Sequence, residues 1–389
     1  MNAIRVFLRT AIWLVFLAIS GTAFGQDVLP FETTAPHAIL IDAKSGTVFF
    51  EKKADELVQP ASMSKLMTMV MVFEALKAGT VTEETEFSIS VNAWKRGGTS
   101  SGGSTMYANV NTNVRLIDLM HGAMIQSAND ACIAIAEGMA GSEDEMAARM
   151  TKRGKELGLQ EDAVFGNVTG LPKPENRASV RDLTILARYI ISEFPEYYKI
   201  YGKPEFTWNK ITQKNRNPLL LDYPGADGVK TGYIREAGYG LVGSAVRDGR
   251  RLILVVAGLS SIAERKEEAQ KLLDWGFRQF KTVDVYVAGD VVSKARVWGG
   301  TSRWVDLVIK QDLRLALSAK EQENVEVKLS YAGPLIAPVK AGTPIGTVRF
   351  LMDGKAIADV KVETANDVAA VDSIWSRAMD SLLILALGG

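Results

Sequence analysis

Three short motifs in this 389-residue chain bring hydroxyl, ammonium and amide groups together at spacings that suit nucleophilic catalysis. Ser62 and Lys65 form an S-x-x-K motif, Ser127 and Asn129 form an S-x-N motif, and residues 230–232 form a K-T-G motif. A serine hydroxyl becomes an effective nucleophile only when a base within hydrogen-bond reach accepts its proton. Each motif alone is a weak signal, whereas the three in this order are a specific one.

Lysine is the expected base, because the chain has only two histidines, His37 and His121, which makes a histidine-dependent triad a poor explanation. Lys65 follows Ser62 by three residues and therefore returns to the same face of a helix. Burial and a neighbouring cation both lower the pKa of a lysine. We expect Lys230 to be that neighbouring cation.

The remaining motif residues suit proton transfer and substrate binding. Ser127 can pass a proton between the lysines and a leaving amine, and Asn129 offers an amide to substrate backbone. The K-T-G motif lies on a predicted strand, which can pair with a peptide as an added strand. Gly232 would let substrate lie close to that strand. The N–H groups of Ser62 and Tyr233 would form an oxyanion hole.

The elements that must position these motifs follow from hydrophobic periodicity and turn signals. A helix is predicted after Pro60-Ala61, and Asp248-Gly249 is a strong hairpin signal. Strands are predicted at residues 38–42, 47–52, 226–234, 239–246 and 251–259, and helical stretches at 115–139, 179–200 and 262–280. After residue 280 the pattern alternates and is interrupted by turns, which predicts a small all-β domain over residues 281–366.

Composition excludes several classes of function. Lys+Arg and Asp+Glu are both 45, so no basic surplus exists to attract nucleic acid. Cys132 is the only cysteine, which excludes an intramolecular disulfide and a cysteine-rich zinc site. We expect Cys132 to be a small buried core residue. No metal and no cofactor are predicted.

The two ends of the chain predict an exported protein that touches a membrane. Residues 1–25 carry Arg5 and Arg9, an apolar run and a small-residue cleavage site, which is the pattern of a signal peptide. At the other end, residues 367–389 predict an amphipathic helix. Its apolar residues recur at spacings of 3 and 4: Val368, Val371, Trp375, Ala378, Leu382 and Leu385. Such a helix suits the membrane interface, and docking on protein is the alternative.

The residues around the motifs resemble a known family. The matching stretches are residues 60–68, 92–94, 101–106, 126–131, 215–217, 227–232 and 272–277. In these stretches the chain is similar to the low-molecular-mass penicillin-binding proteins, the serine-type D-alanyl-D-alanine carboxypeptidases. The resemblance covers residues 30–280 closely. One departure is Thr169, which stands before Gly170-Leu171-Pro172 where members often have histidine.

The resemblance implies an α+β fold of the serine β-lactamase and penicillin-binding transpeptidase type, with an antiparallel sheet flanked by helices over residues 26–280. It implies that Ser62 is acylated and that Lys65 is its base. Ser127, Asn129 and Lys230 complete proton transfer and substrate positioning. The remaining substrate-binding residues are implied to be Thr231, Gly232 and Tyr233 on the strand, Arg216 at the rim, and Arg265, which would bind the substrate's terminal carboxylate.

The implied substrates are peptidoglycan stem peptides, with β-lactams as suicide substrates. The implied place is the periplasm, where the C-terminal helix would attach the protein to the outer face of the inner membrane. A DD-endopeptidase that cuts peptide cross-links remains an alternative. A class A β-lactamase lacks support, because residues 160–177 contain no Glu-x-x-x-Asn arrangement. The non-enzymatic alternative is a penicillin-binding scaffold protein.

Overall fold

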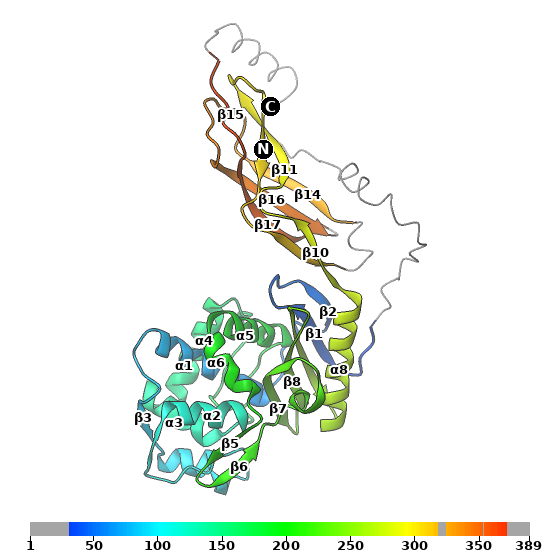
Figure 1. Ribbon diagram of the computed structural model, residues 1–389. Coiled ribbons are helices and arrows are strands. Elements are labelled where there is room, and N and C mark those ends of the chain that lie inside the picture. Colours follow the sequence, from blue (N-terminus) through cyan, green and yellow to red (C-terminus); the bar gives the residue numbers. More distant parts are fainter. Residues whose placement is uncertain (1–30, 318–323, 353, 372–389) are drawn as a thin grey trace. The chain divides into compact units, whose positions relative to one another are not determined.

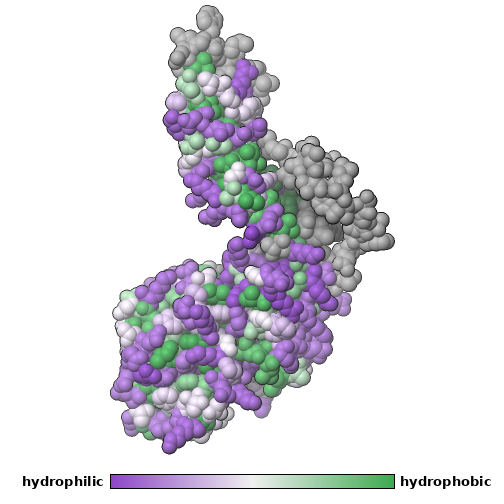
Figure 2. Space-filling view, in the orientation of Figure 1, coloured by the Kyte–Doolittle hydropathy of each residue, from purple (hydrophilic) through white to green (hydrophobic). Residues whose placement is uncertain are grey.

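The computed structural model describes residues 31–317, 324–352 and 354–371, which divide into two compact units (Figure 1). One unit ends at Arg278 and the other begins at Gln279. Hydrophilic residues cover most of the visible face of the first unit (Figure 2). The three motifs all lie in this first unit.

A five-stranded antiparallel sheet in the order β2-β1-β9-β8-β7 forms the centre of the first unit. Its strands are β1 (His37–Asp42), β2 (Val48–Lys52), β7 (Ala226–Ile234), β8 (Gly238–Arg247) and β9 (Arg250–Leu259). All five match the predicted strands to within a residue at each end. The predicted hairpin is confirmed: Asp248 and Gly249 both have positive φ, as a two-residue turn requires. Because β7 is the last strand in this order, one of its edges pairs with no other strand of the sheet.

Helices cover both faces of this sheet, and the buried pattern of β9 explains why. Residues 252–256 of β9 are all fully buried, so both faces of the strand must be covered. One face packs on α8 (Ile262–Gln279), where Gly276 allows close approach to Leu40. The other face packs on the helical cluster that contains α1 (Lys65–Lys77) and α5 (Val180–Glu193). The predicted α+β fold with an antiparallel sheet is confirmed.

Further helices, helical turns and two ribbons complete this unit. The helices are α2 (Leu116–Ile125), α3 (Asn129–Ala140), α4 (Glu143–Glu156), α6 (Pro195–Tyr198) and α7 (Leu219–Asp222). The tight 3₁₀ turns are η1 (Ala61–Ser64), η3 (Thr99–Ser101) and η4 (Lys199–Gly202), and η2 (Ala93–Gly97) is a wider π-helical turn. Two small ribbons pair β3 (Glu86–Ser88) with β4 (Asn113–Arg115), and β5 (Glu205–Trp208) with β6 (Ile211–Lys214).

Two predicted helical stretches are interrupted. Residues 115–139 form two helices rather than one, because Ser127 between them adopts a left-handed conformation with φ 65°. Residues 179–200 divide into α5, α6 and η4, because Phe194 leaves the helical conformation and Pro195 starts the next helix. Proline is favoured at the first position of a helix and cannot continue the preceding one.

The described part of the second unit is all β, as predicted. Its strands are β10 (Lys281–Tyr286), β11 (Val291–Trp298), β12 (Trp304–Val308), β13 (Leu313–Leu317), β14 (Glu326–Tyr331), β15 (Leu335–Ile336), β16 (Pro344–Met352) and β17 (Lys355–Thr364). Six of them form a sheet in the order β14-β16-β17-β12-β11-β15, and β10 pairs with β13. Alternate residues such as Ala295 and Val297 fill its apolar core.

The start of the predicted C-terminal helix is wrong. Val368 is buried in the β-domain core and exchanges backbone hydrogen bonds with Val339, so it cannot lie on a helix face. The Val371 N–H donates to the Gly299 carbonyl at 2.8 Å. The rest of that predicted helix, residues 372–389, and the predicted signal peptide, residues 1–25, lie outside the described residues. Among the described helices, none combines the length and apolarity that crossing a membrane requires.

Candidate active site

The nucleophile turn η1 brings Ser62 and Lys65 together. Lys65 is the first residue of α1, and its Nζ lies 3.0 Å from the Ser62 Oγ. The Lys65 side chain is buried, whereas Ser62 is only half-buried. The serine oxygen is therefore accessible to a substrate while its nitrogen partner is shielded from water.

Three acceptors surround the Lys65 ammonium group. Besides the Ser62 Oγ, Nζ donates to the Asn129 Oδ1 at 2.8 Å and to the Thr169 carbonyl oxygen at 2.5 Å. An ammonium group has three N–H donors, so each is used. When Lys65 loses a proton, the Asn129 and Thr169 bonds can keep the amine in place and leave its lone pair for Ser62.

Burial lowers the pKa of Lys65 to about 8. The positive charge of Arg216 lowers this pKa further, and the nearby groups of Cys132 and Asp130 act in the opposite direction. The predicted direction and the predicted effect of burial are therefore right, but the cation that lowers this pKa is Arg216 rather than Lys230. Burial lowers the pKa of Lys230 well below its usual value, and the charge of Lys65 adds to this effect.

The S-x-N motif lies where α2 ends and α3 begins. The left-handed conformation of Ser127 turns the chain, and Asn129 then starts α3 with its N–H bonded to the Ser104 carbonyl at 2.8 Å. Among the described residues, the buried Ser127 Oγ has no hydrogen-bond partner. A buried hydroxyl without a partner costs free energy, and such groups concentrate at functional sites.

Asp130 fixes this turn to a neighbouring segment, a function that the sequence analysis missed. Its buried carboxylate accepts hydrogen bonds from the Thr105 Oγ1 at 2.6 Å and from the N–H groups of Met106, Ala108 and Ala131 at 3.0 to 3.3 Å. Burial nevertheless raises its pKa. The carboxylate thus holds the start of α3 against residues 105–108. A carboxylate directly after the motif was the available signal in the sequence.

The K-T-G motif lies on the edge strand β7, beside the nucleophile turn. Lys230 is buried, and its Nζ donates to the Thr231 carbonyl at 3.0 Å. A Cβ atom at Gly232 would lie 2.9 Å from the Pro60 carbonyl oxygen and 3.3 Å from the Ala61 Cβ. The close neighbour that requires glycine here is therefore the nucleophile turn, whereas the sequence analysis assigned that place to substrate.

Arg265 connects to this strand through two aromatic rings. It is buried on α8, with its guanidinium 5.6 Å from the centre of the Tyr239 ring, and Tyr239 stacks on Tyr233 of β7 at 4.2 Å. Within the described residues the Arg265 Nε has no hydrogen-bond partner. Burial lowers the pKa of Arg265 to about 10. A buried cation with a free donor is suited to an anion.

Arg216, which was expected at the rim of the site, is exposed, and its Nη1 donates to the Ser104 Oγ at 2.6 Å. Its charge lowers the pKa values of Lys65, Lys230 and Arg265, so it lies close enough to act on all three. Four basic side chains, those of Lys65, Lys230, Arg216 and Arg265, therefore lie close enough to influence one another. Their mutual repulsion favours a bound carboxylate.

Residues 167–171 contribute a wall that the motifs did not reveal. The Thr169 carbonyl binds Lys65, while the Asn167 Oδ1 accepts bonds from the N–H groups of Thr169 and Gly170 at 3.1 and 2.7 Å. A Cβ atom at Gly170 would overlap the Ala61 carbonyl. The side chain of Thr169 bonds to Asn167, so only its backbone faces Lys65. Backbone contacts of this kind leave no signal in a sequence.

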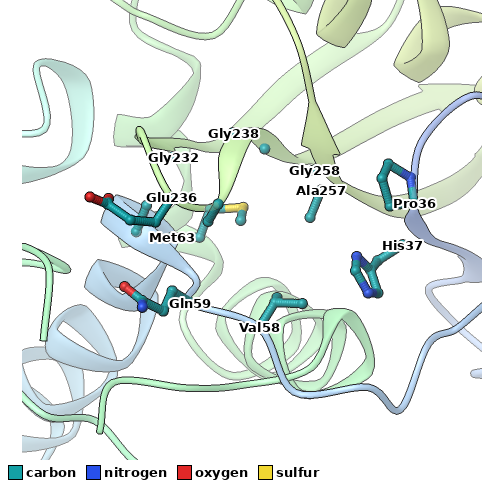
Figure 3. A pocket seen from close by; sticks show the side chains of 13 residues that line it. Pro36, His37, Val58, Gln59, Met63, Gly232, Glu236, Gly238, Ala257 and Gly258 are labelled. Atoms are coloured by element: carbon teal, nitrogen blue, oxygen red, sulfur yellow. The ribbon is translucent and has the colours of Figure 1, made fainter. Parts of the chain in front are cut away.

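A pocket of about 460 Å³ adjoins the site behind the nucleophile turn (Figure 3). Small residues of the sheet, Gly232, Gly240 and Gly258, line one side of it. Met63 packs against Gly232 and Gly240 on that side, and Val58 lies across the pocket (Figure 3). None of the side chains of Ser62, Lys65, Ser127, Asn129 or Lys230 lines this pocket. Ala61 of the nucleophile turn and Gly232, which adjoins it, both line the pocket.

Comparison with known proteins identifies this arrangement. Residues 23–261 match the family described as D-alanyl-D-alanine carboxypeptidase. The chain belongs to the D-alanyl-D-alanine carboxypeptidase family. Residues 280–370 match the C-terminal domain of penicillin-binding protein 5. The family and the fold expected from the resemblance are confirmed, and with them a serine-type carboxypeptidase of the penicillin-binding protein class that acts in peptidoglycan metabolism.

The similarity extends over nearly the whole chain. The D-alanyl-D-alanine carboxypeptidase DacA of Haemophilus influenzae is 35% identical over 98% of this chain and 97% of its own length. DacC of Escherichia coli is 36% identical over 94% of this chain and 93% of its own. The crystal structure of penicillin-binding protein 5 from Haemophilus influenzae is similar with a TM-score of 0.77 at 36% identity, covering 88% of this chain and all of that one.

Proposed function

We propose that this carboxypeptidase removes the terminal D-alanine from peptidoglycan stem pentapeptides through an ester on Ser62. The observation that carries the proposal is the 3.0 Å contact between the Ser62 Oγ and a buried lysine amine whose pKa is lowered to about 8. With that pKa, roughly a tenth of Lys65 is neutral at pH 7. The neutral amine is the form that can accept the serine proton.

In the acylation step, Lys65 accepts the proton of Ser62 as the serine oxygen attacks the carbonyl carbon that precedes D-alanine. The electron pair of the carbonyl moves to its oxygen, where the N–H groups of Ser62 and Tyr233 would bind the negative charge. Two such donors are typically worth several kcal/mol in the transition state. Breaking the C–N bond then restores the carbonyl and forms the ester.

The leaving amine needs a proton, which Ser127 would relay from Lys65 or Lys230. The Ser127 hydroxyl is suited to a relay because it is buried, has no hydrogen-bond partner in the described chain, and stands two residues before Asn129, which binds Lys65. D-alanine then departs. A water molecule that gives its proton to Lys65 attacks the ester, and Ser62 recovers its proton as the shortened peptide leaves.

The edge strand β7 and the four basic side chains would bind the substrate. The peptide would pair with β7 along residues 230–233, with Asn129 bonding to its backbone. The terminal carboxylate would bind Thr231 and Arg265, whose free Nε supports this role. A β-lactam would acylate the same serine, and because its ring opening releases no leaving group, the ester persists.

The proposed place of action is the periplasm, at the outer face of the inner membrane. The signal-peptide pattern of residues 1–25 supports export, and the amphipathic pattern after residue 371 supports attachment to the membrane surface. Processing of the expressed protein after residue 25, read by mass spectrometry, tests export. Retention of the unprocessed chain would contradict it.

Release of D-alanine from a pentapeptide that ends in D-Ala-D-Ala tests the proposed chemistry. The chain, Ser62→Ala and the control Ser192→Ala are assayed together with a fluorescent penicillin. Ser192 is an exposed serine on α5, away from the motifs. We expect the parent and the control to release D-alanine and to take the label, and Ser62→Ala to do neither. Labelling without release, with disappearance of cross-linked dimers, would favour the endopeptidase instead.

A further inference from the structure

Three large apolar side chains lie together on one face of the second unit. In the order β12-β11-β15, Arg296 pairs with Trp304, and Trp298 pairs with Ile336. Paired residues on neighbouring strands point to the same face, and alternate residues along a strand share a face. Ala295 and Val297 are buried in the core, so these four residues lie on the opposite, outer face.

We call Trp298, Trp304 and Ile336 the tryptophan patch. Ile336 is 70% exposed and Trp304 is 47% exposed, although both are large apolar residues. Scattered apolar residues on a surface are ordinary, but neighbouring ones on adjacent strands suggest an interaction site. The surrounding segments, residues 296–304 and 333–338, contain two arginines and no carboxylate.

The described chain ends beside this patch. The Val371 N–H donates to the Gly299 carbonyl, and the Thr301 N–H donates to the Ala369 carbonyl, both at 2.8 Å. Gly299 directly follows Trp298, and the Ala337 N–H bonds to the Trp298 carbonyl at 3.0 Å. Figure 1 shows the end of the described chain, in red, at the same end of this unit as β15.

We propose that the tryptophan patch is a second membrane contact, which enters the headgroup region beside residues 372–389. This inference rests on the proposed membrane location. If the segment after residue 371 lay in the interface, as proposed above, the loop after Trp298 would lie near the lipid surface, since each residue of chain spans at most about 3.6 Å. Tryptophan favours the membrane interface, and arginines beside it attract anionic headgroups.

A lipid surface explains the patch better than the folding of residues 372–389 onto it. The apolar positions of that segment are one face of a single amphipathic stripe, which cannot cover the patch and enter lipid at once. The segment also carries two carboxylates, Asp372 and Asp380, but they fall on another face of the same pattern than its apolar positions. If the apolar face covered the patch, these carboxylates would point away from the two arginines. The arginines match anionic lipid instead.

Site-specific fluorescence on the chain from residue 26 to Gly389 tests this contact. Cys132 is buried and is the only native cysteine, so Trp304→Cys, Ile336→Cys and the control Val291→Cys can each be labelled with an environment-sensitive dye. Val291 is an exposed apolar residue at the other end of β11. Vesicles contain phosphatidylethanolamine and phosphatidylglycerol.

We expect vesicles to shift the emission of the dye to the blue at positions 304 and 336 and to leave position 291 unchanged. The double variant Trp304→Ser/Ile336→Ser should partition onto vesicles about tenfold more weakly than Val291→Ser. If the protein binds vesicles but the dye emission at positions 304 and 336 does not shift, the tryptophan patch is not a membrane contact. The proposed membrane location would be unaffected by that result. No binding by any variant would overturn both, and carboxypeptidase activity is unaffected by either result.

A third outcome identifies another occupant. A blue-shifted dye at position 304 before vesicles are added, which reverts when residues 372–389 are deleted, would show that this segment covers the patch. That result would also overturn the proposal.

Discussion

Replacing Lys65 by arginine keeps a positive charge beside Ser62 but removes the amine that lies 3.0 Å from the serine oxygen. Arginine stays protonated in proteins, whereas burial lowers the pKa of Lys65 to about 8. General-base catalysis typically contributes 10²–10⁴-fold to a rate. We therefore expect acylation of Lys65→Arg by penicillin to be at least about 100-fold slower than that of the parent.

The pH dependence of acylation gives a second, independent measure of the same amine. The neutral fraction of Lys65 is roughly 1% at pH 6, a tenth at pH 7 and half at pH 8, from its pKa of about 8. The acylation rate of the parent should therefore rise about tenfold per pH unit up to pH 7 and level off above pH 8. Lys65→Arg should show no such rise.

Stopped-flow measurement with a fluorescent penicillin gives both rates. Thermal unfolding of each variant shows whether the larger guanidinium disturbs the buried site, and Lys65→Gln provides a neutral, smaller replacement. A parent rate that is flat between pH 6 and pH 8, or a folded Lys65→Arg that acylates within tenfold of the parent, would refute Lys65 as the base.

Three further changes have consequences that the geometry predicts. Lys65→Met removes a lysine whose pKa in the folded protein lies below its pKa in the unfolded chain, so the parent loses stability as pH falls from 10.5 towards 8. In urea unfolding, the free energy of unfolding of the variant minus that of the parent should be about 3 kcal/mol greater at pH 7 than at pH 10.5. No change in this difference would contradict the lowered pKa. Asp130→Ala leaves four buried hydrogen-bond donors without their acceptor and should lower the free energy of unfolding by about 2–4 kcal/mol. Asp144 is exposed, so the control Asp144→Ala should have a free energy of unfolding close to that of the parent. Arg265→Gln should lower kcat/KM for the pentapeptide by about 10–100-fold, because a charged hydrogen bond to the substrate is lost. The same substitution should affect a peptide with an amidated C-terminus far less. Equal losses on both peptides would exclude a contact between Arg265 and the terminal carboxylate.

Several features of this protein could be read directly from residue order. The strands beside the motifs were predicted because local signals decide them: alternating or continuous apolar runs, and the Asp248-Gly249 turn between β8 and β9. The three motifs were found because each joins functional groups that lie within three residues of one another. The family follows from the same short stretches.

What the sequence alone left open was decided by contacts between segments far apart in the chain. The Thr169 carbonyl lies against Lys65 across 104 residues, and any residue type supplies a carbonyl, so no pattern could reveal it. The pKa of Lys65 depends on burial and on Arg216, which only packing brings near. Position 232 requires glycine because Pro60 and Ala61 lie close to it. Val368 lies in the β domain rather than on a helix because it exchanges backbone hydrogen bonds with Val339. Local sequence thus determined which groups are available, and the tertiary structure decided their neighbours, because burial and distance are properties of the packed chain.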